Sequence, residues 1–159
     1  MREYNTIDKS NWGDGPWLSE PDKVQWTDES TGLPCLAVRH KESGHWCGYV
    51  GVSALHPLHG IDYDQAHRMA DISCHGGLTY SAGCSHGDEA TSICHVPEPG
   101  QPDDVWWLGF DCNHHRDLAP AMEAKLPRFR GHTVYRTLEY VREQCASLAG
   151  QLSQVQSNE

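Results

Sequence analysis

The alternation of hydrophobic and polar positions predicts a chain built mainly of short β-strands and closed by one long helix. Apolar side chains alternate or cluster in short runs, and turn-forming stretches separate these runs. The predicted strands cover residues 24–26, 33–39, 45–53, 75–81, 92–96 and 104–112. Because short turns join the first three strands, we expect a mainly antiparallel sheet.

One apolar stripe defines the C-terminal part of the chain. Its members recur at spacings of three and four residues, which predicts a helix over residues 134–154. They are Leu138, Val141, Cys145, Leu148, Leu152 and Val155. A shorter helix is expected to begin after Asp62, which can cap it, and to run to about Ala70. These elements predict an α+β fold, with a sheet of about six strands and the long C-terminal helix packed on one face.

The length of 159 residues suits one domain with a substantial core. We expect a single domain over residues 1–155, in which residues 1–31 form an N-terminal strap and residues 134–155 form the C-terminal helix. Residues 156–159 are expected to be a disordered tail. Residues 113–132 look irregular because prolines and a glycine interrupt them, and two interpretations of this segment stay open: a lid or a plain connection.

The charge balance argues against nucleic-acid binding. The chain carries 22 acidic and 12 basic residues, a net charge of −10 with histidine neutral. Such a surface repels phosphate backbones at long range, so no polynucleotide partner is expected. Lys125, Arg128 and Arg130 form the one weak basic cluster, and solvated loop charges explain it better than a binding patch.

The N-terminal residues and the cysteines indicate a cytoplasmic protein. The first residues are polar and lack the apolar core of a signal peptide, and no run approaches transmembrane length, so no membrane partner is expected. The seven cysteines are an odd number and no secretion signal accompanies them. We expect them to be reduced, and most of them to be small buried side chains.

The stretch from His75 to Tyr80 is the first candidate for a binding site. Gly76 and Gly77 stand together in it, and adjacent glycines in a strand usually mean that another backbone or a ligand comes close. His75 and Thr79 beside bare backbone amides could hold a phosphate or a carboxylate. The alternative is a β-bulge with a satisfied histidine next to it.

The second candidate is the aromatic strand that ends in Asp111 and His114. Gly109 leaves room beside Trp107, so an exposed face of that indole with Asp111 nearby would suit a nucleobase. The alternative, which the pattern favours, is that both tryptophans of this strand belong to the core. A ligand pocket is therefore expected between residues 75–80 and 107–114, and no cofactor is required.

Two kinds of chemistry remain as weaker alternatives at the same place. Cys112 and His114 are two residues apart and could bind zinc together with His75. Alternatively, Cys112 with either histidine and with Asp111 or Asp117 contains the parts of a nucleophile, a base and an orienting acid. The chain has no paired metal-ligand motif, so neither alternative is specific.

Several motifs together resemble a group of small uncharacterised proteins of bacteriophages and bacterial genomes. They are His75-Gly76-Gly77-Leu78-Thr79-Tyr80, Cys94 to Gly100, Asp104-Val105-Trp106-Trp107-Leu108-Gly109-Phe110-Asp111-Cys112, Trp46 to Val52 and His56 to Gly60. The likeness runs from about Leu33 to Leu148 and omits the strap. It implies a phage or prophage origin and the host cytoplasm as the setting, and it brings no activity with it.

Three functions follow as hypotheses. The preferred one is a phage-type small-ligand-binding protein that sequesters a nucleotide-derived host signal as a counter-defence. The second is a Cys/His-dependent or zinc-dependent hydrolase. The third is a protein-interaction module that acts through the acidic surface and the C-terminal helix. Two interpretations of the apolar stripe stay open: packing on the chain's own sheet alone, or partial use in a homodimer through that helix, because the stripe is longer than a small sheet needs.

Overall fold

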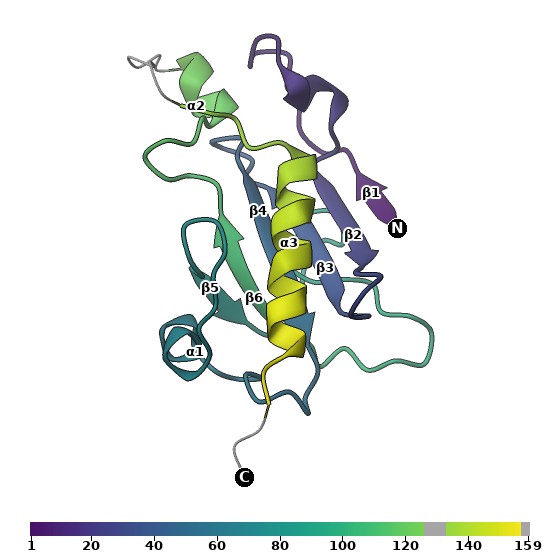
Figure 1. Cartoon of the computed structure of the whole chain (residues 1–159). Helices are drawn as coiled ribbons and strands as arrows, with labels where there is room; N and C mark the ends of the chain where they lie inside the picture. The colour runs from purple at the N-terminus through teal and green to yellow at the C-terminus, as the bar shows by residue number, and fades with distance from the viewer. Residues whose placement is uncertain (126–132, 157–159) are drawn as a thin grey trace.

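The computed structural model describes residues 1–125 and 133–156 and consists of one sheet with a long helix across it (Figure 1). The strands are β1 (Arg2–Tyr4), β2 (Lys23–Thr27), β3 (Pro34–Arg39), β4 (Trp46–Val52), β5 (Tyr80–Ala82) and β6 (Trp106–Asp111). The helices are α1 (Tyr63–Met69), α2 (Pro120–Lys125), α3 (Leu138–Ser153) and a 3-10 helix, η1 (Pro16–Ser19). The six strands lie in the order β1-β2-β3-β4-β6-β5, and each pair of neighbours is antiparallel. The predicted α+β fold is confirmed.

Helix α3 lies across one face of the sheet and buries its apolar stripe there. Thr137 caps the helix, since its hydroxyl oxygen accepts a hydrogen bond from the Tyr140 amide at 3.2 Å. The buried members of the stripe are Val141, Cys145, Leu148 and Leu152. Because the chain's own sheet covers this stripe, the helix offers no argument for a second copy of the chain.

The other face of the sheet is covered by the long connection between β5 and β6. The hydrophobic cluster on this face consists of Leu36, Tyr49 and Trp107, and Ile93 and Val105 of the connection pack against it. The predicted strand over residues 92–96 is wrong, because this segment is a loop. The sixth strand is instead β1, which pairs with β2 at the edge of the sheet.

Lys23 fixes that connection and explains why it forms no strand. Its side chain is buried, and its ammonium donates to the carbonyl oxygens of Glu89, Ser92 and Cys94 at 2.6, 2.7 and 2.9 Å. These carbonyls are therefore satisfied by a side chain and not by a neighbouring strand. Burial lowers the pKa of Lys23, and the nearby Glu89 and Asp88 oppose this effect.

Arg39 fastens the N-terminal strap to the sheet and to α3. The buried guanidinium pairs with Asp22 at 3.1 Å and with Glu20 at 3.2 Å, and it stacks over the Trp46 ring at 4.3 Å. The other oxygen of Glu20 accepts the Leu138 amide, at the start of α3, at 2.6 Å. One carboxylate therefore joins the strap to both layers.

Other expectations are corrected or fall outside the described residues. Residues 113–132, expected to be irregular, contain α2, whose Ala121 amide donates to the Ser43 carbonyl at 3.0 Å, so this part is packed against the β3–β4 turn. Cys84 and Cys94 form a disulfide, so the expectation of reduced cysteines is wrong for this pair. Residues 126–132, which include two arginines of the weak basic cluster, and tail residues 157–159 lie outside the described ranges.

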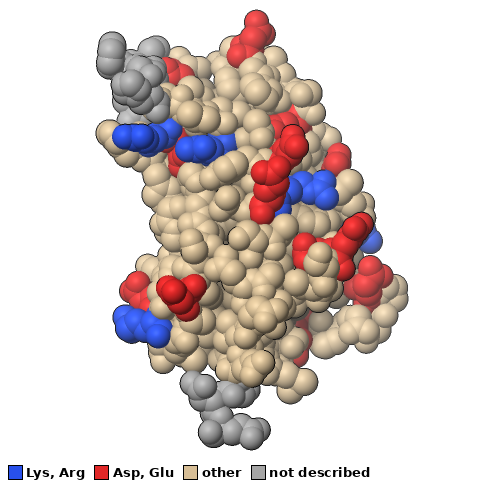
Figure 2. Space-filling model, in the orientation of Figure 1, with Lys and Arg blue, Asp and Glu red and all other residues tan. Residues whose placement is uncertain are grey.

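The surface carries its charges in small groups. On the face shown in Figure 2, the basic side chains of the described residues form separate clusters among scattered acidic ones. Of the helices in the two described ranges, none is long and apolar enough to cross a membrane. Among the described residues, this view shows no continuous basic area of the kind that a polynucleotide backbone needs.

Candidate functional site

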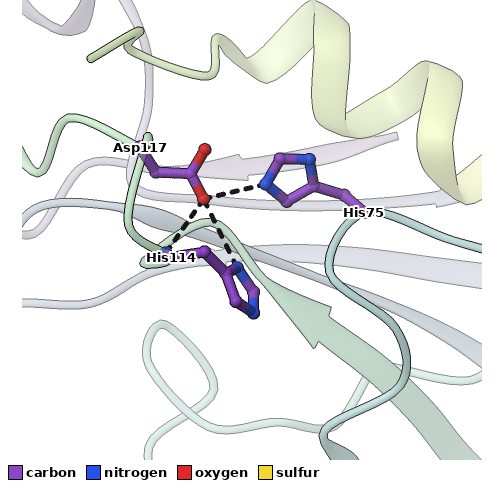
Figure 3. A group of neighbouring side chains, drawn as sticks. All are labelled: His75, His114 and Asp117. Atoms are coloured by element: carbon purple, nitrogen blue, oxygen red, sulfur yellow. Dashed lines mark hydrogen bonds and ion pairs between the residues drawn. The ribbon is translucent and has the colours of Figure 1, made fainter. Parts of the chain in front are cut away.

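The carboxylate of Asp117 is the centre of a polar cluster where β6 ends (Figure 3). Asp117 is only 3% exposed. One of its oxygens, Oδ2, lies 2.8 Å from Nε2 of His75 and accepts the backbone amide of His114 at 3.0 Å. The other oxygen, Oδ1, accepts the Arg136 Nε–H at 2.9 Å. Segments before β5, after β6 and before α3 therefore meet at one side chain.

These contacts keep Asp117 ionised although it is buried. Burial by itself raises the pKa of the carboxyl group. The hydrogen bonds from His75, from the His114 amide and from Arg136 outweigh that effect, so the pKa lies below its ordinary value. Asp117 is consequently a fixed negative charge in a largely water-free place.

His75 is held on three sides. It stands in a turn in which the Gly77 amide donates to the Cys74 carbonyl at 2.9 Å. Its backbone amide donates to Oε1 of Gln144 at 3.0 Å, and its Nδ1 lies 2.7 Å from the Tyr140 hydroxyl. Both partners project from α3. The ring nitrogen Nε2 is therefore aimed at Asp117 by a long, rigid helix.

The expectation of a strand at residues 75–79 is wrong, and the two glycines explain why. Gly76 and Gly77 have φ angles of +69° and +82°, which residues with a Cβ atom rarely adopt. A Cβ on Gly76 would lie 2.2 Å from Cε1 of His114. A neighbouring group does come close to Gly76, but it is an imidazole ring of the same chain and not the backbone or ligand that the sequence predicted.

His114 is the exposed member of the cluster. Its Nδ1 lies 3.4 Å from Oδ2 of Asp117 and 3.5 Å from Oδ1 of Asp111, and its side chain is 38% exposed. The hydroxyl of Thr79 donates to the other oxygen of Asp111 at 3.0 Å. The two carboxylates face Nδ1 of the ring, the Cε1–Nε2 edge lies against Gly76, and the side chain is in part exposed to solvent.

The donor atoms of this cluster are close enough together to be shared by one metal ion. One atom each of His75, His114 and Asp117 lie within 4.8 Å of one another. In a tetrahedral zinc site with bonds of about 2.0–2.1 Å, neighbouring ligand atoms are about 3.3 Å apart. The separation between His114 Nδ1 and Asp117 Oδ2, 3.4 Å, already fits, and His75 Nε2 has to withdraw by about 0.5 Å from its present contact.

Three residues that the sequence proposed for the site do not take part in this cluster. Trp107 is fully buried on the opposite face of the sheet, so it has no free ring face for a nucleobase. Tyr80 packs its ring edge against Tyr49 on that face. Cys112 is 2% exposed and lies in the core under α3, where burial above all raises its pKa, so it is neither an activated nucleophile nor a metal ligand here.

Other residues of the cluster were missed or named only as alternatives. The sequence offers Asp117 only as one of two possible acids. A signal in its favour is that His114 and Asp117 are three residues apart directly after a strand. Tyr140, Gln144 and Arg136 were not identified. Tyr140 and Gln144 flank the apolar stripe of α3, and such positions are ordinarily solvent-facing, whereas Arg136 precedes the helix. The sequence carries no signal that a loop covers them.

The chain matches no family model, no curated protein and no solved structure. Its site is therefore interpreted from its own geometry, and the resemblance to phage and bacterial proteins stays a prediction.

Gly76→Ala and Gly77→Ala separate backbone strain from the contact with His114. Both variants place alanine at a positive φ, which costs about 1 kcal/mol. Only Gly76→Ala also pushes the His114 ring away, so we expect it to lower the free energy of unfolding by about 2–3 kcal/mol. Urea denaturation measures both values, and equal losses in the two variants would show that the ring does not lie against Gly76.

Asp117→Asn tests the buried charge through its pH dependence. We expect a loss of about 3 kcal/mol in the free energy of unfolding at neutral pH. Because the native pKa of Asp117 is lowered, its contribution is complete above the unfolded value of about 3.9 and disappears as the pH falls through the native value. Urea titrations from neutral pH down to about pH 3 should therefore show the two proteins converging only in acid. A constant difference would contradict this.

Proposed function

We propose that the chain is a zinc-dependent hydrolase whose metal is bound by His75, His114 and Asp117. The observation that carries the proposal is the convergence of two imidazoles on one buried carboxylate. Structural zinc sites in proteins are usually closed and rich in cysteine, whereas catalytic sites combine three ligands from histidine and carboxylate with one open position. The donor set and the partly exposed side chain of His114 correspond to the second kind.

The surroundings of the three residues support this assignment. Histidine ligands of metals almost always use their second nitrogen in a hydrogen bond, and ligating carboxylates are hydrogen-bonded in turn. Here Nδ1 of His75 faces the Tyr140 hydroxyl, and Oδ1 of Asp117 accepts from Arg136. Each of these two ligands thus keeps one atom for the metal and has its other polar atom fixed by the protein.

Asp111 is the residue that we assign as general base. Its carboxylate is partly exposed, lies 3.5 Å from the His114 ring and is oriented by the Thr79 hydroxyl. Held by these three residues, zinc would lower the pKa of a bound water to about 7 and so would supply a nucleophile near neutral pH. Asp111 accepts the proton of the water that adds to a carbonyl or phosphoryl centre, and it returns the proton to the leaving group as that bond breaks.

Metal analysis of the protein with its disulfide intact tests the zinc site. We expect about one zinc ion per chain, lost in His114→Ala and kept in His115→Ala, because the adjacent His115 is exposed and lies outside the cluster. Tyr140→Phe should weaken zinc binding about tenfold, as loss of an outer hydrogen-bond partner does. Zinc that is absent, or retained equally by His114→Ala, would refute the centre.

Turnover is measured on the same proteins with chromogenic carboxylic and phosphate esters. Asp111→Asn should keep the zinc and lose activity, whereas His115→Ala should keep both. A zinc-loaded protein that hydrolyses neither class would refute the reaction but leave the metal site standing.

Small-ligand capture, the function preferred from the sequence, is the second candidate, at a different place. A cavity of about 450 Å³ lies on the sheet face away from α3, bordered by Val38, Cys47 and Tyr49 and by the connection at Thr91 and Ile93. This volume is that of a small-molecule site. Sequestration of a nucleotide-derived signal, as in phage counter-defence, would use this cavity without turnover.

A blocking substitution distinguishes capture from hydrolysis. The protein is incubated with a nucleotide mixture, washed and heated, and the released compounds are identified by mass spectrometry. Capture predicts an intact nucleotide from the unmodified protein and from Asp111→Asn, and none from Thr91→Trp, which fills the cavity. Release of no nucleotide from the unmodified protein would remove this candidate.

A further inference from the structure

A second group of side chains that carry metal-ligand atoms lies on the loop between β5 and β6. Its centre is the disulfide between Cys84 and Cys94. The other five cysteines (Cys35, Cys47, Cys74, Cys112 and Cys145) are free thiols. Sulfur atoms of Cys84 and Cys94 and a carboxylate oxygen of Asp103 lie within 4.8 Å of one another.

Asp103 makes two close contacts in this group, one with Cys94 and one with His95, and neither of them is a hydrogen bond. The carboxylate oxygens of Asp103 lie 3.5 and 3.6 Å from Sγ of Cys94, and a disulfide sulfur carries no proton to donate. Nε2 of His95 is buried without a hydrogen-bond partner in the described structure, and it lies 3.7 Å from Oδ1 of Asp103. A buried polar atom without a hydrogen bond, as Nε2 of His95 is, is rare in proteins and calls for an explanation, of which an ion or a redox role is one.

An imidazole and a hollow complete the arrangement. Nδ1 of His86 lies 3.9 Å from Sγ of Cys84. A hollow of about 250 Å³ is lined by the two cysteines, His86, His95 and Asp103. It is large enough for an ion, and its lining offers sulfur, nitrogen and oxygen donors.

We propose that reduction of the Cys84–Cys94 bond converts this group into a second zinc site, with Cys84, Cys94, His86 and Asp103 as ligands. A dithiol reductant reduces the Cys84–Cys94 disulfide by thiol–disulfide exchange. The protein then carries two thiols, and the reductant is oxidised to a cyclic disulfide. Zinc then displaces one proton from each thiol and binds the two thiolates. Thiolates combined with imidazole and carboxylate are donors that Zn²⁺ accepts in tetrahedral sites.

Lys23 makes this exchange possible without a large rearrangement of the loop. Its ammonium holds the carbonyl oxygens of Ser92 and Cys94 whether or not the sulfurs are bonded to each other. The backbone on one side of the disulfide is therefore fixed to β2, and Cys84 with His86 has only to move within the hollow. In the loop that carries Cys84 and Cys94, a metal crosslink thus replaces the covalent crosslink while the backbone near Cys94 stays at the same place.

Cobalt titration tests the site, because thiolate-bound Co²⁺ shows a near-ultraviolet charge-transfer absorption that nitrogen and oxygen ligands do not give. The full-length protein is reduced with dithiothreitol, freed of it without oxygen and titrated with CoCl₂. We expect the thiolate band to saturate at about one ion per chain. It should be absent in the oxidised protein and in Cys84→Ser, and kept in Cys74→Ser, whose cysteine lies outside the group.

His86→Ala keeps both cysteines and changes an exposed side chain, so it tests the assignment without disturbing the core. We expect cobalt affinity to fall at least about tenfold, since removal of even an outer hydrogen-bond partner of a metal typically costs about 10- to 100-fold. An unchanged affinity in His86→Ala, or a reduced protein without the thiolate band, overturns the proposal. His114→Ala should leave this band intact, so failure of the site at Asp117 is distinguishable from failure here.

Discussion

The buried charge of Asp117 fixes three segments that the sheet by itself does not join. The turn at His75, the end of β6 at His114 and the approach to α3 at Arg136 all donate to one carboxylate. An ionised group in such a place is stable only while these donors are present, so the local fold and the geometry of the site are maintained by the same contacts. The rigid helix α3 adds to this by holding His75 through Tyr140 and Gln144.

The two faces of the sheet carry different chemistry. Under and beside α3, nitrogen and oxygen donors converge on Asp117, and the nearby thiol of Cys112 is buried away from them. On the opposite face, the connection that Lys23 anchors brings Cys84 and Cys94 together beside Asp103. Because one donor set lacks sulfur and the other is built around it, the proposed reaction and the proposed redox-dependent metal site can be studied separately in one protein.

The sequence predicts the fold well where periodicity decides it, and less well where distant contacts decide it. The apolar stripe of α3 and the alternating strands follow from local patterns. Residues 92–96 have a strand-like pattern, but their carbonyls are taken by Lys23, about 70 residues away. In the site, the glycine pair and the strand end located His75 and His114. Tyr140 and Gln144 could not be found, because only the folded loop shows that these helix positions are covered.

The most direct test of the central claim is zinc X-ray absorption on the protein with its disulfide intact, loaded with about one equivalent of zinc. The account predicts a first shell of nitrogen and oxygen at about 2.0–2.1 Å, outer-shell scattering from two imidazoles and no sulfur. A sulfur shell at about 2.3 Å, or a shell without imidazole scattering, would contradict the assignment of His75, His114 and Asp117 as the ligands.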